Sequence, residues 1–293
     1  MRPASSAKLA PLALALLLPL TPRPAHSQAS EIPSAQSPHL DTETSDQRGR
    51  ALLAQRVEAL GGDTWLNRRD MVVRGHTATF FHGNPTGMVV EYSGARQFAE
   101  DGRPEAERIG FITEKSMILP GHKIDVVQIY TQGKGYEVTY KGKTPLPADQ
   151  VEDYNRRMNH SIESVITDWM KKPDVMIIDE GTSMVERRLA HKVTVLAANN
   201  DAVTIEIDAN THLPLRRSYQ TRNEKFKDID TDVEEYDDYH TIQGLPTAMT
   251  LTRYHDDDMS GQRFYTTVEY NKGLDPALFN PDNLLPSSKQ KKP

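Results

Sequence analysis

The sequence contains no cysteine among its 293 residues. This absence excludes a disulfide framework, a cysteine nucleophile and a cysteine that carries a lipid anchor. Stability must therefore come from an ordinary hydrophobic core, which a folded segment of about 250 residues is long enough to form. The net charge is −6, and the sequence has no basic stripe that could contact phosphates, so we do not expect a nucleic-acid partner.

The sequence also lacks the motifs of the common enzymes. It has no G-x-S-x-G nucleophile elbow, and no glycine-rich phosphate loop that follows a strand and opens a helix. The histidines show no H-E-x-x-H or similar pairing, so no zinc site is indicated. These absences argue against the common enzymes and do not exclude an unfamiliar one. Our prediction is a protein that is not an enzyme, without catalytic residues, a bound metal or a cofactor.

Only one long hydrophobic run is present, Leu9–Leu20. It follows Arg2 and Lys8, and small residues at Ala25–Ser27 offer a cleavage point. This arrangement is typical of a secretory signal peptide, which we place at residues 1–27. The alternative is an uncleaved membrane anchor, but two prolines interrupt the run and it is short for spanning a bilayer. We expect export to the periplasm as a soluble protein.

The rest of the chain divides into a linker, one domain and a tail. Residues 28–46 are rich in Ser, Pro, Thr and Gln and predict a disordered linker. Residues 47–285 predict a single domain, and the short basic segment 286–293 predicts a disordered tail. The domain begins with a helix at Arg48–Leu60, because leucine and valine recur at helical spacing before the stop signal Gly61–Gly62.

From Met71 onward, short segments alternate apolar and polar residues between turns of Gly, Asn and Pro. We predict strands at 71–82, 87–93, 96–101, 107–114, 124–131, 135–140, 174–180, 183–188, 191–198, 202–208, 213–220, 226–240, 247–256 and 262–270. Short turns between consecutive strands favour an antiparallel meander. A sheet of about a dozen strands curls toward a barrel or splits into a sandwich.

One long helix interrupts the strands, in "LPADQVEDYNRRMNHSIESVITDWMKK" at 146–172. Its apolar residues recur mostly at steps of three and four and form one stripe: Val151, Tyr154, Met158, Ile162, Val165, Ile166 and Trp169. A later hairpin, 203–219, presents a dry face of Val203, Ile205 and Ile207. Because the helix lies within the order of strands, we expect it to pack inside the curled sheet against such faces.

The acidic stretch 228–240 is the best candidate for a metal site. Four carboxylates share one face of a predicted strand: Asp228, Asp230, Asp232 and Glu234. His255 and Asp256, on a later strand, lie close enough in the expected meander to join them. Carboxylates at alternate positions suit a hard cation such as calcium. The alternative is a solvated sheet face, or a sheet edge that charged residues protect from pairing. Because the stretch has no EF-hand spacing, we favour this alternative.

Three segments of the last third combine strand and turn signatures: "VTIEIDANTHLPLRRSY", "VEEYDDYHTIQGLPTAMTLTRY" and "VEYNKGLDPALFNP". Upstream, "IYTQGKGYEVTYKG" adds a strand pair with a glycine turn, and "ALLAQRVEALGG" adds an initial helix. Together they resemble the LolA/LolB-like superfamily of periplasmic outer-membrane lipoprotein-sorting and carrier proteins. The resemblance implies a mainly β fold with helices (α+β). In this fold an incomplete antiparallel β-barrel wraps around a long amphipathic helix, with an apolar cavity between them.

The same resemblance implies a carrier that shields acyl chains of a lipid or lipoprotein, with donor and acceptor proteins of the envelope as partners. Ligand contacts are expected from apolar side chains that face the cavity: Phe80, Val90, Tyr92, Phe98, Ile162, Trp169, Met249 and Leu251. For the aromatic residues a role as core anchors remains open. Two other functions also remain open, an envelope-stress sensor of the same fold and a metal-dependent enzyme that uses the acidic strands.

Overall fold

A computed structural model describes residues 44–112, 126–139, 141–223 and 227–283. The expected signal peptide (1–27), the tail (286–293) and most of the linker (28–46) lie outside these residues. Within the described part of the chain, no helix has the length and apolar character that crossing a membrane requires.

The helical segments are α1 (Ser45–Leu60), α2 (Asp63–Leu66), α3 (Ala148–Asn159), α4 (Ile162–Thr167) and the 3₁₀ turns η1 (Trp169–Lys171) and η2 (Pro276–Phe279). The strands are β1 (Asp70–Phe81), β2 (Asn84–Phe98), β3 (Pro104–Ile112), β4 (Val126–Thr131), β5 (Lys134–Thr139), β6 (Gly142–Pro145), β7 (Met176–Val185), β8 (Arg188–Leu196), β9 (Ala202–Asp208), β10 (Pro214–Asn223), β11 (Asp228–Ile242), β12 (Leu245–His255) and β13 (Asp258–Tyr270).

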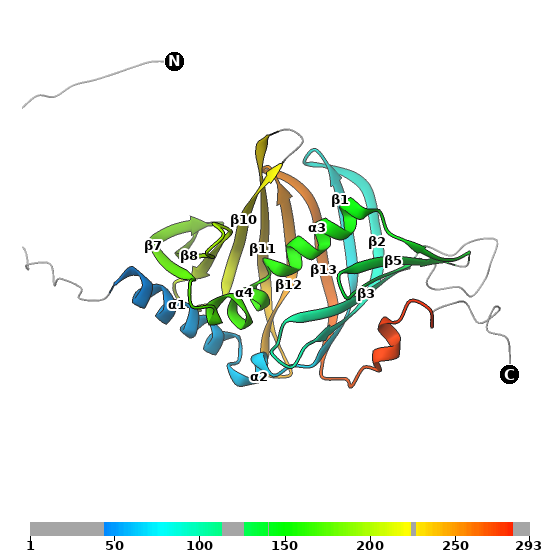
Figure 1. Ribbon diagram of the computed structural model, residues 1–293, viewed down its shortest axis with the longest axis horizontal. Helices are drawn as coiled ribbons and strands as arrows, with labels where there is room; N and C mark the ends of the chain where they lie inside the picture. Colours follow the sequence, from blue (N-terminus) through cyan, green and yellow to red (C-terminus); the bar gives the residue numbers. More distant parts are fainter. Residues whose placement is uncertain (1–43, 113–125, 140, 224–226, 284–293) are drawn as a thin grey trace, which may run out of the picture. The chain divides into compact units, whose positions relative to one another are not determined.

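The described strands form one antiparallel sheet that curls without closing (Figure 1). Its order is β6-β5-β4-β3-β2-β1-β13-β12-β11-β10-β9-β8-β7. The strands β6 and β7 are therefore the two edges, while β1 and β13 pair in the middle and join two meanders. The expected fold class, an incomplete antiparallel barrel, is confirmed.

A helical crossover, α3 to η1, connects the two edges of the sheet. It follows β6 in the sequence and precedes β7, so the chain must pass from one edge to the other across the concave face. Figure 1 shows α3 running diagonally over the strands. Its Tyr154, together with Ile162 and Val165 of α4, belongs to the main hydrophobic cluster. The crossover thus roofs the concave face, as the sequence predicted.

The prediction of one continuous helix over 146–172 is wrong, because the crossover breaks at His160 and Ser161. The Ser161 side chain accepts a hydrogen bond from the backbone N–H of Ser164 at 3.1 Å and starts α4 as its N-cap. The His160 ring is buried, with Nε2 2.8 Å from a carboxylate oxygen of Asp201. A cap and a tertiary contact therefore end α3 in the middle of an unbroken apolar stripe.

Other element boundaries also differ from the prediction. The strands expected at 87–93 and 96–101 are one strand, β2, because Gly94 is not in a turn. A Cβ at Gly94 would lie 2.7 Å from Cγ2 of Val73, so glycine permits the close approach of β1. The strands expected at 174–180 and 183–188 likewise form one strand, β7, with a register shift between Asp179 and Thr182.

The first helix begins earlier than expected and covers the exposed edge of β7. Thr44 and Gln47 form a capping box, so α1 starts at Ser45, inside the predicted linker. The Ser45 hydroxyl accepts a hydrogen bond from the backbone N–H of Asp179 at 2.8 Å. A carboxylate oxygen of Asp46 accepts one from the N–H of Ile177 at 3.2 Å. Two backbone donors of the edge strand are therefore satisfied by side chains of α1.

The dry face of the β9–β10 hairpin lies in the centre of the core. Val203, Ile205 and Ile207 are fully buried. They share one hydrophobic cluster with Leu53 of α1 and Val165 of α4. The first helix and the crossover together therefore bury the face that the alternation of the sequence predicted.

Candidate functional site

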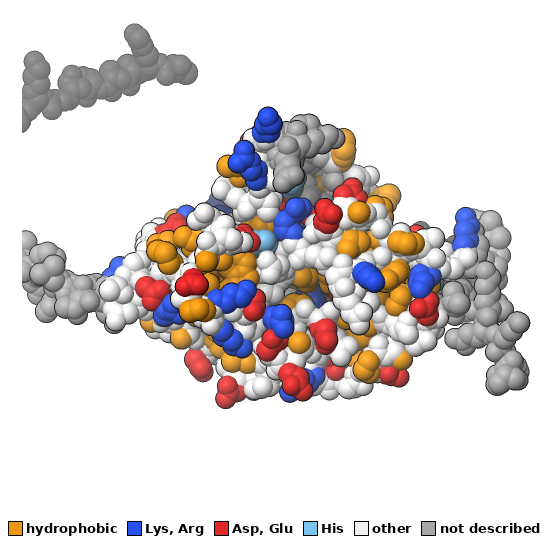
Figure 2. All heavy atoms as spheres, in the orientation of Figure 1, with side chains coloured by type: hydrophobic (Ala, Val, Ile, Leu, Met, Phe, Trp, Pro, Cys, Tyr) orange, Lys and Arg blue, Asp and Glu red, His pale blue; other side chains and the backbone are white. Residues whose placement is uncertain are grey.

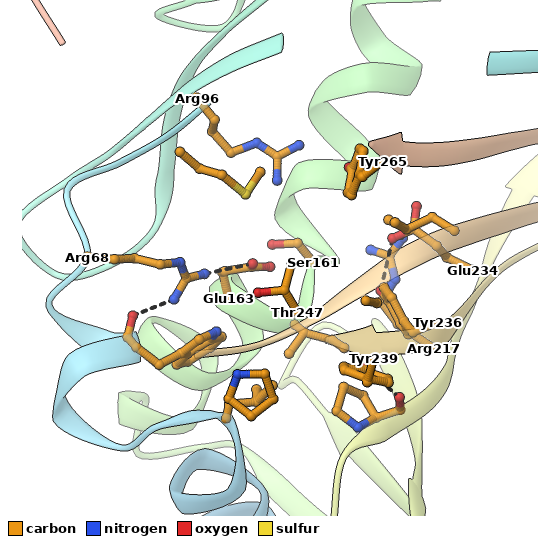
Figure 3. A pocket seen from close by; sticks show the side chains of 18 of the residues that line it. Arg68, Arg96, Ser161, Glu163, Arg217, Glu234, Tyr236, Tyr239, Thr247 and Tyr265 are labelled. Atoms are coloured by element: carbon orange, nitrogen blue, oxygen red, sulfur yellow. Dashed lines mark hydrogen bonds and ion pairs between the residues drawn. The ribbon is translucent and has the colours of Figure 1, made fainter. Parts of the chain in front are cut away.

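Two adjoining cavities lie between the concave face of the sheet and the helices. The inner cavity has a volume of about 130 Å³ and is lined by residues of α1, α2, α4 and the strands β1, β2 and β10–β13 (Figure 3). The outer cavity, about 500 Å³, lies between α3 and the strands β1 and β10–β13. The two cavities share part of their lining: Arg217, Glu234, Leu251, Arg253 and Arg263.

The structure places the predicted ligand residues in three settings. Three line the inner cavity, and the last of them also lines the outer one: Phe98, Ile162 and Leu251. Three are buried in the core around the cavities but are not part of their described lining: Tyr92, Trp169 and Met249. Two are half-buried on the β1–β2 hairpin and line neither cavity: Phe80 and Val90.

The lining of the inner cavity is more charged than the sequence predicted. Alongside its apolar residues it contains six arginines: Arg56, Arg68, Arg96, Arg217, Arg253 and Arg263. A seventh, Arg157, lines the outer cavity. Figure 3 shows Arg68 and Arg96 on one side, and Arg217, Glu234 and Tyr236 on the other. The cavity is therefore an amphipathic site with an excess of arginine, not the uniformly apolar one expected.

Glu234 is the centre of one ion-pair cluster. Its carboxylate lies 2.8 Å from Nε of Arg253 and 3.7 Å from Nη2 of Arg217, and it accepts a hydrogen bond from the Tyr236 hydroxyl at 2.9 Å. Burial would raise the pKa of Glu234, but the charges of Arg217 and Arg253 outweigh it and hold the pKa well below its usual range. The cluster therefore stays ionised and fixes β10, β11 and β12 to one another.

Arg68 forms a second cluster on the opposite wall. Its Nη2 donates to Glu163 at 2.8 Å, and Nη1 donates to the backbone carbonyl of Trp65. The guanidinium lies 4.2 Å from the ring centroid of Trp65 and 4.3 Å from that of Phe98. Aromatic faces at these distances attract a cation. Arg68 therefore joins α2, β2 and α4 at the inner cavity.

Arg56 differs from these arginines because its guanidinium is unpaired. The side chain is 0% exposed, and none of its nitrogens Nε, Nη1 and Nη2 has a hydrogen-bond partner among the described residues. The Trp65 ring centroid lies 5.8 Å away. Burial, only partly offset by Tyr239 and Glu163, lowers the pKa of Arg56 to about 10. The residue is therefore still a cation at neutral pH.

The acidic face predicted as a metal candidate is divided by the fold. Asp228 is exposed near the hairpin tip, whereas Glu234 is buried in its arginine cluster. Asp230, His255 and Asp256 can each offer one atom within 4.8 Å of the others. His255 Nδ1 also lies 3.1 Å from Asp232. The four predicted carboxylates therefore do not act as one site, because the strand carries them from solvent into the cavity.

The outer surface contrasts with the cavity. On the face that carries α3, basic and acidic side chains are interspersed without a broad area of one sign (Figure 2). The concentration of arginine that lines the inner cavity is therefore not repeated on this face of the molecule.

No family model and no curated protein matches the sequence. Solved structures do match. A DUF1329 family protein from Desulfovibrio piger is 13% identical, with a TM-score of 0.54, over 81% of this chain and 98% of that chain. A LolA superfamily protein from Nitrosomonas europaea is 9% identical, with a TM-score of 0.48, over 80% of this chain and 99% of that chain. The first similarity shows a shared fold, and the open sheet curled around helices is the architecture that the sequence resemblance predicts.

Proposed function

We propose that the protein is a periplasmic binding protein of the outer-membrane lipoprotein-sorting type, which shields acyl chains of a lipid or lipoprotein between the curled sheet and its helical crossover. The observation that carries this proposal is the inner cavity, which is lined together by the apolar side chains of Phe98, of Ile162 from α4 and of Leu251. Each methylene buried there contributes about 0.8 kcal/mol to binding.

The volume of the inner cavity sets a condition on uptake. It is about 130 Å³, close to that of cavities that hold a single benzene ring, whereas pockets for larger ligands span roughly 300–1,000 Å³. A long acyl chain therefore has to extend into the outer cavity or displace the crossover from the sheet. The break at His160–Ser161 divides the crossover into two helices, so a displacement of one does not require the other to bend. Donor and acceptor proteins of the envelope are the partners that such a carrier requires.

Substitution of Leu251 by tryptophan tests the proposal, because Leu251 lines both cavities. A larger neutral side chain fills the space without adding a charge beside Arg253 and Arg263. We expect Leu251→Trp to weaken binding of a palmitoylated peptide by about tenfold or more, since excluding two methylenes removes over 1.4 kcal/mol. Leu189→Trp, at an exposed position of β8, is the matched control.

Native mass spectrometry and a fluorescent lipid-displacement assay on the exported protein provide the readouts. Circular dichroism verifies that both variants fold. Equal binding by Leu251→Trp and the wild type would contradict the placement of the acyl chain. Absence of any lipid from the wild type, both as purified and after incubation, would contradict the proposed function itself.

A further inference from the structure

The carboxylates of the inner cavity are already committed to other arginines. Glu163 pairs with Arg68 at 2.8 Å, and Glu234 pairs with Arg253 and Arg217. Glu107, behind the cavity, pairs with Arg96 at 3.0 Å. Among the residues that the structure describes, Arg56 has no carboxylate within ion-pair distance and no hydrogen-bond partner. Within the described part of the chain, the fold therefore supplies an anion for Arg68, Arg96, Arg217 and Arg253. Arg56 and Arg263 have none within ion-pair distance there, and of these two only Arg56 is fully buried with all three guanidinium nitrogens unbonded.

An unpaired, fully buried guanidinium is strongly destabilising, since desolvation disfavours the charged form and no hydrogen bond compensates. The contact with Trp65 is a weak substitute. Its 5.8 Å distance is near the limit for a cation over a ring, and Arg68 occupies the same ring at 4.2 Å. A residue that lowers stability in this way is best explained by a ligand that pairs with it.

The position of Arg56 defines what that ligand can be. Arg56 belongs to the lining of the inner cavity, together with Trp65, Leu60 and Thr247. Because its side chain is 0% exposed, neighbouring side chains must shift before an oxyanion can contact the guanidinium. Its fork of N–H groups matches the geometry of carboxylate and phosphate oxygens. A volume of about 130 Å³ accommodates such a group with a few methylenes, and the lining shared with the outer cavity provides a path for the rest of a chain.

We propose that the inner cavity binds the oxyanion of an acidic lipid, a carboxylate or a phosphate, on the guanidinium of Arg56. This inference rests on the proposed function and specifies the class of lipid. The head group enters first and is buried at α1, while the acyl chain extends past Leu251 toward the outer cavity.

Three probes with the same acyl chain length test the proposal: palmitate, palmitoyl lysophosphatidic acid and hexadecanol. We expect the wild type to bind at least one anionic probe about tenfold or more tightly than hexadecanol. A hydrogen bond to a charged group contributes enough free energy to change affinity by about that factor. Tighter binding of palmitate identifies a carboxylate as the preferred group, and tighter binding of lysophosphatidic acid identifies a phosphate.

The variant Arg56→Met should lose the preference for anionic probes and keep its affinity for hexadecanol. It should also raise the Tm of the ligand-free protein, whereas a structural role for Arg56 predicts a lower Tm. Arg56→Lys should retain part of the preference, since it keeps the charge. Arg50→Met removes an arginine of the same helix that pairs with Asp46 outside the cavities, and it should behave as the wild type.

Equal binding of all three probes by the wild type would overturn the inference and leave the proposed function standing. Failure of every probe to bind would overturn both. An unchanged anionic preference in Arg56→Met would assign the oxyanion to another cavity arginine and would also overturn the inference. The comparison among probes uses only the wild type, so it tests the class of lipid even where a variant does not fold. The Arg56 variants then decide which arginine holds the oxyanion.

Discussion

Glu107 illustrates how single residues around the cavity depend on one another. It is buried on β3, 3.0 Å from Nη2 of Arg96. Burial would raise the pKa of its carboxyl, but the charges of Arg96 and Arg263 outweigh it and lower the pKa from 4.5 to about 2. Because the folded-state pKa is depressed, this carboxyl stabilises the fold fully above pH 4.5, and the contribution is lost as the pH falls through about 2.

Replacing Glu107 with glutamine should therefore flatten the acid dependence of stability. We expect the wild type to lose about 2–3 kcal/mol of unfolding free energy from this group between pH 6 and pH 2, and Glu107→Gln to lack that component. At pH 6 the variant should be less stable, because Arg96 keeps its charge without a partner. Urea titrations at both pH values measure the difference. Glu105→Gln, exposed on the same strand, should keep the wild-type dependence, and an equal dependence in Glu107→Gln would contradict the assignment.

At the scale of elements, the joint between α3 and α4 determines how the crossover is held. The His160 ring stacks on Tyr219 of β10, with centroids 4.2 Å apart, and its Nε2 lies 2.8 Å from Asp201. Arg217 donates to the backbone carbonyls of His160 at 2.8 Å and of Arg157 at 3.0 Å. The joint is therefore fastened to β10 and to the β8–β9 turn. The first turns of α3 are held at the other side by β4, where Gln150 donates to the Tyr130 hydroxyl at 3.1 Å.

Replacing Asp201 with alanine should loosen this joint. We expect backbone amides of α3 to exchange about fivefold to tenfold faster in hydrogen–deuterium exchange, since one charge-assisted hydrogen bond is lost. Exchange in α1 should not change, because α1 packs mainly against β7. Asp174→Ala, at an exposed position after η1, is the control. Unchanged exchange in α3 would show that Tyr219 and Arg217 hold the joint without Asp201.

Periodicity predicted the hairpins well, because a strand with one buried face has apolar residues at alternate positions, as at Val203, Ile205 and Ile207. The break at His160 left only the N-cap residue Ser161 as a local record. Its other support comes from Asp201, in the β8–β9 turn, and from Tyr219 of β10, which spacing cannot reveal. The charged lining was missed because arginine in a strand is ordinarily assigned to solvent. Alternation did carry the signal for Arg253, which lies two residues after Leu251 and shares its face of β12.

One signal of the cavity was nevertheless present in the sequence. Arg56 lies three residues after Leu53 and four before Leu60, and both leucines are buried on the core-facing side of α1. A charged residue on an apolar stripe is the exception that helical periodicity can detect. Its lack of a partner depends on the folded chain and could not be read from spacing.

At the scale of the whole molecule, the open sheet has edge strands whose free backbone groups could pair with another copy of the chain. Side chains of α1 blunt β7, where Ser45 and Asp46 accept hydrogen bonds from the backbone. The double variant Ser45→Ala and Asp46→Ala should increase self-association through edge pairing and lower the Tm, at about 1 kcal/mol for each lost hydrogen bond. Light scattering over a concentration series measures the association. Arg50→Ala breaks only the surface pair with Asp46, and association equal to that of the double variant would contradict the explanation.

The crossover also fixes how far the two edges of the sheet can separate. It is a tether between β6 and β7, and its length depends on how much of it is helical. A residue advances about 1.5 Å in a helix and about 3.3 Å when extended, so unwinding the six residues of α4 would lengthen the tether by about 11 Å. The separation of the two sheet edges is thus limited by how many helical turns the crossover keeps. A ligand that moves the edges apart must therefore cause a measurable loss of helix.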